Sequence, residues 1–220
     1  MSIEIKILTM GIAVTNCYVV GDTDSGKAVV IDPVDEAARI HQTAQDAGWT
    51  VELILATHGH FDHVLASKAL KDLTGAPFYI HEEDMRFLDV LPQTGLRYTG
   101  QLFPEAAEPD RFLTSEPETI EVGTIRLETL FTPGHAPGHI CFHMPDHNLV
   151  FNGDTLFKGN IARTDLPDAD QSLLIRSIVD KLFALGDDTQ LLPGHMEPTT
   201  VGQERRTNPF IRLYTDDFSS

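Results

Sequence analysis

Residues 57–63 have the sequence THGHFDH and begin at the last residue of the apolar run LILAT. A short apolar run of this kind is typical of a buried strand. Four side chains that commonly bind metals fall within six positions after it: His58, His60, Asp62 and His63. His58 and His60 lie two apart in a short turn and can reach one ion. Asp62 and His63 fall on the far side of that turn and can serve a second ion.

The same local pattern, an apolar run followed by glycine and a side chain of the metal-binding type, recurs three times. LETLFTPG precedes His135, NLVFNG precedes Asp154, and TQLLPG precedes His195. A buried strand holds its last residue in a fixed place, and glycine lets the backbone turn sharply there, so we expect the four strand ends to converge on one cleft. Seven side chains would then surround two divalent cations, with a carboxylate shared between them. Zinc is the expected metal, with iron or manganese as alternatives, because all three accept these donors.

Short strand-like runs and three amphipathic helices make up most of the chain. The helices are predicted at residues 35–48, 65–75 and 170–186, and each ends at a glycine. Several strands followed by a helix occur in both halves, which predicts an α/β fold of two β-layers with helices outside, a four-layer αββα sandwich. Residues 91–118 show little periodicity and are predicted to form a loop or short-helix insertion, a candidate lid. We expect residues 1–220 to form a single domain.

The composition excludes several classes of partner. The chain has 16 Lys and Arg against 33 Asp and Glu, a formal net charge of −17, which repels nucleic acid and anionic membrane surfaces. There is no basic, apolar leader and no apolar run long enough to span a bilayer, so a cytoplasmic location is expected. The two cysteines, Cys17 and Cys141, lie far apart in apolar surroundings and are expected to be reduced and buried.

Four motifs in fixed order identify the chain as a member of the metallo-β-lactamase superfamily: THGHFDH (57–63), TPGHAPGH (132–139), NGDTLF (152–157) and LLPGH (191–195). Within it, the chain resembles the short glyoxalase II-like (hydroxyacylglutathione hydrolase-like) enzymes through three further segments: IDP (31–33), ARTDLP (162–167) and GQERRTNPF (202–210). The resemblance covers about residues 3 to 210. Only 25 residues follow His195, too few for the helical domain that helps full-length glyoxalase II to hold glutathione.

The resemblance also implies a role for each residue of the cluster. It assigns the first metal to His58, His60 and His135, and the second to Asp62, His63 and His195. Asp154 would bridge the two metals, and Asp62 and Asp154 would be the catalytic carboxylates. Two further residues are candidate substrate contacts. Arg163 is expected either to bind a substrate carboxylate or to pair with Asp165. His139 is expected either to line the site or to form a hydrogen bond that supports it.

The predicted activity is hydrolysis of a small thioester of the S-acylglutathione type. Two cations would lower the pKa of a shared water toward neutrality, and a thiolate leaves without a separate acid. One alternative is a persulfide dioxygenase on the same fold, with a single iron held by His58, His135 and Asp154. A lactonase or other ester hydrolase would share the hydrolytic mechanism and differ in the pocket walls. The non-enzymatic alternative is a metal-bearing scaffold that binds a partner.

Overall fold

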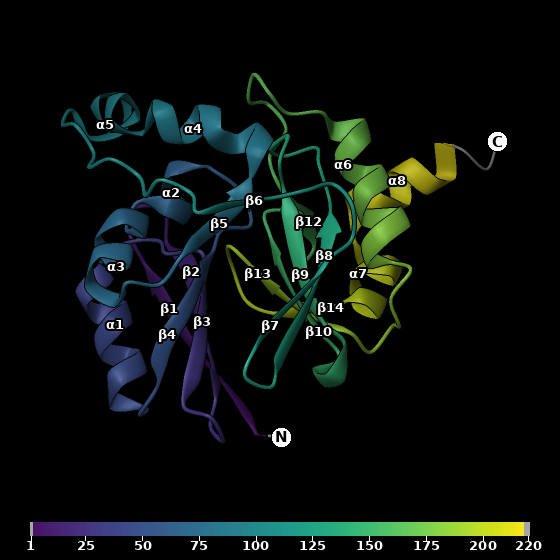
Figure 1. Cartoon of the computed structure of the whole chain (residues 1–220). Helices are drawn as coiled ribbons and strands as arrows, with labels where there is room; N and C mark the ends of the chain where they lie inside the picture. The colour runs from purple at the N-terminus through teal and green to yellow at the C-terminus, as the bar shows by residue number, and fades with distance from the viewer. Residues whose placement is uncertain (1, 218–220) are drawn as a thin grey trace.

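Two six-stranded β-sheets pack face to face in the computed structural model, which describes residues 2–217 (Figure 1). The first sheet has the spatial order β1 (Ile3–Met10), β2 (Thr15–Asp22), β3 (Lys27–Ile31), β4 (Thr50–Leu55), β5 (Phe78–His81) and β6 (Arg111–Leu113). The second has the order β14 (Thr199–Thr200), β13 (Gln190–Pro193), β10 (Leu149–Gly153), β9 (Ile140–Met144), β8 (Ile125–Phe131) and β7 (Thr119–Val122). A small separate hairpin consists of β11 (Leu156–Phe157) and β12 (Asn160–Ile161).

Helices cover the outer face of each sheet (Figure 1). On the side of the first sheet lie α1 (Ala37–Asp46), α2 (Phe61–Val64), α3 (Ser67–Thr74), α4 (Met85–Asp89) and α5 (Leu91–Thr99), with one 3-10 turn at Glu82–Asp84. On the side of the second sheet lie α6 (Gln171–Ser177), α7 (Val201–Thr207) and α8 (Pro209–Asp217). A second 3-10 turn spans Pro145–His147, and a π-helical segment, Ile178–Leu182, continues α6.

Buried apolar side chains form three layers, which the two sheets separate. Val30 packs with Ile40 of α1 and Leu70 of α3 in the outer layer of the first sheet. Its neighbour Ile31 points the opposite way, into the layer between the sheets with Phe142, because successive side chains of a strand alternate between faces. A third layer lies between the second sheet and its helices. Three apolar layers and two sheets make the four-layer αββα sandwich that the sequence predicts.

Strand direction brings the motif loops together at one edge. β8 and β10 each run antiparallel to β9, and β10 runs parallel to β13, so the carboxyl ends of β8, β10 and β13 lie on the same edge of the second sheet. The loops that follow these strands carry His135, Asp154 and His195. β4 ends opposite them in the facing sheet, where the backbone N–H of Ile140 donates to the carbonyl of Thr57 at 2.8 Å. The topology therefore provides the convergence that the sequence pattern indicates.

The insertion at 91–118 is partly helical and also contains a strand. Its first nine residues form α5, in agreement with the short helix expected there. The strand β6 was not predicted; it pairs in parallel with β5, with Tyr79 opposite Arg111. Because β6 has only three residues, two of them exposed, it carries no alternating pattern that a sequence could reveal. The helix predicted from residue 170 begins there, with the Asp170 carboxylate accepting from the Leu173 N–H at 2.9 Å.

Both cysteines are buried and unpaired, as predicted. Across residues 2–217, the helices are all too short or too polar to cross a bilayer.

Candidate metal centre

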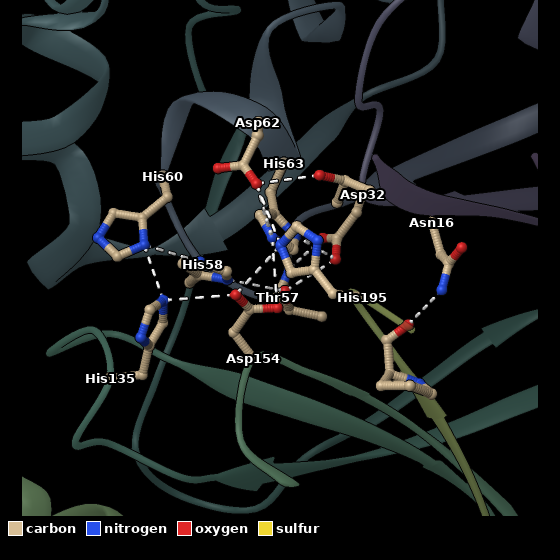
Figure 2. A network of polar contacts seen from close by, with 12 residues as sticks. Asn16, Asp32, Thr57, His58, His60, Asp62, His63, His135, Asp154 and His195 are labelled. Carbon is tan, nitrogen blue, oxygen red and sulfur yellow. Dashed lines mark hydrogen bonds and ion pairs between the residues drawn. The ribbon is translucent and has the colours of Figure 1, made fainter. Parts of the chain in front are cut away.

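All seven residues predicted to form the cluster lie together at the edge where the four strands end (Figure 2). Their donor atoms fall into three overlapping sets, in each of which the atoms lie within 4.8 Å of one another: His58, His60 and His135; His58, His63 and Asp154; and Asp62, His63 and His195. Asp154 stands between the outer two sets. Its Oδ2 lies 3.6 Å from His135 Nε2 and 3.4 Å from His195 Nε2, and its Oδ1 lies 3.5 Å from His63 Nε2.

Two glycines make this crowding possible. Gly153, directly before Asp154, has a φ of +45°, and a Cβ there would lie 2.6 Å from Thr57 Oγ1. At Gly194, directly before His195, a Cβ would lie 2.4 Å from Asp154 Oδ1. Both separations are too short for any side chain, so glycine is required at these strand ends.

Hydrogen bonds at the back of the first set fix which nitrogens carry protons. Thr57 Oγ1 donates to Asp32 Oδ2 at 2.9 Å, so the same hydroxyl accepts from His58 Nδ1 at 3.1 Å. His135 Nδ1 donates to the carbonyl of Arg163 at 2.8 Å. In its neutral form each ring therefore presents an Nε2 lone pair to the site, as metal-binding histidines do when the other nitrogen is held by a backbone or side-chain acceptor.

These two lone pairs face a third imidazole. His60 Nδ1 lies 3.0 Å from His58 Nε2 and 2.9 Å from His135 Nε2. Burial, together with repulsion from neighbouring imidazoles, lowers the pKa of His58 well below its usual value and that of His60 to about 3. A neutral His60 has one N–H and cannot donate to both neighbours through one nitrogen. A cation accepts all three lone pairs, so the donor chemistry of this set fits a metal ion.

The second set has unpartnered polar atoms at its centre. His63 Nδ1 donates to Asp32 Oδ2 at 2.8 Å, which leaves Nε2 facing the site. Among the described residues, neither His63 Nε2 nor Asp154 Oδ1 has a hydrogen-bond partner, although both are buried. Buried polar atoms without partners cost about 1–3 kcal/mol each, so their presence side by side fits a cation that would bind both.

The electrostatics of the second set favour cations as well. Burial raises the pKa of Asp62, but His63 and His195 outweigh it and hold that pKa at about 2. Burial lowers the pKa of His195, but hydrogen bonds to Asp154 and Asp62 raise it to about 10. The histidine thus holds a proton next to ionised carboxylates. A divalent cation provides the same compensation with more charge, and displaces the proton.

Several supporting residues carry no role in the sequence-based prediction. Thr15 Oγ1 donates to Asp62 Oδ2 at 2.9 Å, and Asn16 Nδ2 donates to the carbonyls of Pro193 and Met196 on either side of His195. Asp32, part of the IDP motif, follows β3 and orients His63 as described above. Its position directly after a strand is a signal that sequence analysis can use. Thr15 and Asn16 lie inside a strand and give no such signal.

Asp84 joins two of the loops that carry the cluster. Its Oδ2 accepts from the Gly59 N–H at 2.8 Å and its Oδ1 from the Gly138 N–H at 2.7 Å. Burial raises the pKa of this carboxyl to about 6, against the two N–H bonds that favour its ionised form. Because its partners are backbone groups 25 and 54 residues away, no local pattern distinguishes Asp84 from its exposed acidic neighbours Glu82 and Glu83.

The two candidate substrate contacts lie in different environments. His139 is fully buried, and its Nε2 accepts from the Asp154 N–H at 3.0 Å. A ring with no exposed surface cannot touch a substrate, so of the two expected roles the structure favours the supporting hydrogen bond, and the substrate-binding assignment of His139 is corrected. Arg163 forms the bidentate pair with Asp165 that was its alternative, at 2.7 and 2.8 Å. Binding of substrate by Arg163 stays a prediction.

Two cavities open onto the cluster. One of about 420 Å³ has His60, Asp62, His135 and His195 on its floor and α5 on its wall. The other, about 430 Å³, lies beyond Asp154 and His195, next to Phe157 and Phe210. A substrate cleaved in its middle needs room on both sides of the reacting group, and this arrangement supplies it.

An αββα sandwich with a buried His/Asp cluster at the joined strand ends is the architecture of the metallo-hydrolase fold. The sequence profile of the Metallo-beta-lactamase superfamily matches residues 10–195, and the chain belongs to that superfamily. It is 39% identical over 209 residues to the hydroxyacylglutathione hydrolase GloC of Haemophilus influenzae, a match that covers 94% of this chain and 98% of the relative. It is 31% identical over 212 residues to the mitochondrial persulfide dioxygenase ETHE1 of Homo sapiens, a match that covers 94% of this chain and 75% of the relative.

Two solved structures have the same fold. The crystal structure of BLEG-1 B3 metallo-beta-lactamase superposes with a TM-score of 0.88 at 35% identity, covering 94% of this chain and 99% of that one. The crystal structure of TTHA1623 in a di-iron-bound form has a TM-score of 0.83 at 36% identity, covering 93% and 99%.

Proposed function

We propose that this protein is a dinuclear metal hydrolase that cleaves thioesters of the S-acylglutathione type. The observation that carries the proposal is the pair of donor sets on either side of Asp154, placed at the floor of an open cavity. The likeness to a relative named hydroxyacylglutathione hydrolase, over nearly the whole of both chains, supports the choice of substrate class. His58, His60 and His135 would hold one cation, and Asp62, His63 and His195 the other, with Asp154 shared.

The chemistry divides between the cations and the chain. When bound, two divalent cations supply a water of near-neutral pKa and polarise the substrate carbonyl. Thr15 fixes Asp62 through Oδ2, which leaves Oδ1 to hold a proton of the attacking water. Oxygen from that water bonds to the carbonyl carbon, the C–S bond breaks, and sulfur leaves with the electron pair. A thiol of ordinary pKa, near 8.5, leaves as thiolate without a separate acid, so the site needs no further donor.

The direct test is the loss of thioester absorbance when the purified protein is incubated with S-lactoylglutathione. We expect turnover that disappears on chelation and returns when zinc, iron or manganese is added. A protein that carries two cations per chain and hydrolyses neither S-lactoylglutathione nor other S-acylglutathiones would contradict the proposal.

A second candidate, persulfide oxidation with a single iron held by His58, His135 and Asp154, is favoured by the 31% identity to the human persulfide dioxygenase. It predicts uptake of O₂ when the iron-loaded protein meets glutathione persulfide. The thioesterase proposal predicts none. An oxygen electrode and the thioester assay, run on the same iron-loaded sample, therefore separate the two.

A further inference from the structure

The cavity over the cluster contains a cation that the proposed reaction does not use. Arg97, on α5, lines the same 420 Å³ cavity whose floor is formed by His60 and Asp62. In Figure 1, α5 lies beyond α2, the short helix that begins directly after His60. One cavity thus joins the metal-binding side chains to the side chain of Arg97.

The positive charge of Arg97 is also not balanced by an ion pair. In the part of the chain that the structure describes, no carboxylate pairs with it; its one recorded contact is with the ring of Tyr98, 5.9 Å from the guanidinium carbon. Arg163, the other arginine of the cavity, differs because its Nε and Nη2 atoms donate to the two carboxylate oxygens of Asp165, which compensates its charge. Arg97 is thus the arginine of this cavity that has no carboxylate partner among the described residues.

The charge of the whole molecule bears on how an anionic substrate could bind near the cluster. A net charge of −17, to which Asp62 and Asp154 of the cluster contribute, repels an anionic substrate at long range. A local positive group offsets this field, and a guanidinium, with its fixed fork of N–H donors, is suited to bind a carboxylate.

Aromatic packing holds Arg97 in place relative to the site. The ring of Tyr98 lies 4.7 Å from that of Phe61, the residue directly before Asp62, and Phe61 packs in turn against Phe103 at 5.5 Å. The segment that presents Arg97 is therefore packed against the segment that presents Asp62. Phe61 and Tyr98 also line the cavity and give it apolar surface.

We propose that Arg97 binds a carboxylate on the thiol portion of the substrate, so that the site selects thioesters of carboxylate-bearing thiols over thioesters of neutral thiols. This inference rests on the proposed thioesterase function. It assigns a specificity-determining contact to α5, an element outside the strand-end motifs, and it places the thiol arm in the 420 Å³ cavity. The acyl arm then occupies the cavity beside Phe157 and Phe210.

The test compares two thioesters of the same acyl group: S-lactoylglutathione, whose thiol carries carboxylates, and S-lactoyl-N-acetylcysteamine, whose thiol is neutral. The ratio of their kcat/KM values is measured for the wild type, Arg97→Gln and Arg176→Gln. Arg176 is the matched control, an exposed arginine of α6 outside both cavities, also without a carboxylate partner among the described residues. We expect Arg97→Gln to lower the ratio about tenfold through a higher KM for S-lactoylglutathione, and Arg176→Gln to leave it unchanged.

Salt provides a second measurement. Raising the ionic strength should raise the KM of the wild type for S-lactoylglutathione more than that of Arg97→Gln, because the screened attraction is already absent in the variant. An unchanged ratio in Arg97→Gln, or an equal loss with both thioesters, overturns the assignment of Arg97 while the thioesterase function stands. A wild-type protein that hydrolyses neither thioester overturns both.

Discussion

Asp154 is the residue on which the candidate centre depends most, because its two oxygens face histidines of different donor sets. We expect Asp154→Ala to lose metal affinity by more than the roughly 10–100-fold typical of supporting residues, and to lose turnover with it. Metal content after dialysis and the thioester assay measure the two effects. Asp146→Ala, which removes an exposed carboxylate on the second 3-10 turn, is the control. Normal kinetics with a full metal content in Asp154→Ala would contradict the assignment.

Asp84 leads to a prediction about stability. Asp84→Ala leaves the buried N–H groups of Gly59 and Gly138 without their acceptor, which should lower the free energy of unfolding by about 2–4 kcal/mol. Asp84→Asn keeps one acceptor oxygen and should lose about half as much. Urea unfolding followed by circular dichroism gives both values, with Asp89→Ala on the exposed side of α4 as the control. The same midpoint for Asp84→Ala and wild type would show that the two loops do not depend on this carboxylate.

The residues of the cluster could be predicted because each follows a buried strand and, at three of the four strand ends, a glycine. The local sequence therefore predicts where His58, Asp154 and His195 lie. Residues that act through distant backbone groups, such as Asp84, carry no such signal. The role of Arg97 needed the structure as well, because the absence of an ion-pair partner is a property of three-dimensional neighbours.

Among the elements, the tip of the β2–β3 hairpin has a titratable link to the second sheet. Asp22 accepts from the Ser25 hydroxyl and from the N–H groups of Asp24, Ser25 and Thr124, the last in the β7–β8 turn. The Ser25 hydroxyl is the largest influence, and with the backbone donors it lowers the pKa of this carboxyl against the effect of burial. The ionised form is thus stabilised in the folded state. Its contribution is present above the unfolded pKa of about 3.9 and is lost as the pH falls below it.

We therefore expect Asp22→Ala to be less stable than the wild type by about 2–4 kcal/mol at pH 7, and by less at pH 3. Denaturant unfolding at the two pH values gives the difference. Asp24→Ala keeps the backbone donor to Asp22 and removes only an exposed carboxylate, so it should match the wild type. A difference between Asp22→Ala and wild type that grows toward low pH would contradict the sign.

Elements with a clear period were predictable, and short ones were not. α3 ends at Gly75, which has a φ of +72°, as its sequence indicates. α4 has five residues and β6 three, too few to show a helical or alternating pattern. The order of strands within each sheet was also outside the reach of the sequence, because it depends on pairing between segments far apart in the chain.

At the scale of the whole molecule, the unpartnered atoms of the cluster couple metal binding to stability. A cation that binds only the folded chain stabilises it by about 2.7 kcal/mol at 100 times its Kd, which for a chain of this size raises Tm by roughly 5–10 °C. Chelation should therefore lower the Tm of the wild type by about that amount, and added zinc should restore it. Asp154→Ala should respond weakly to either treatment. Thermal melts of the wild type that are identical with and without chelator would contradict this coupling.

The proposed dinuclear centre requires that four strand ends assemble two adjoining cation sites around Asp154. Native mass spectrometry of the metal-saturated protein, which counts cations per folded chain, tests it most directly. We expect two cations per chain in the wild type, with turnover of S-lactoylglutathione that reaches its maximum only when both are bound. Saturation at one cation per chain with full turnover would contradict it.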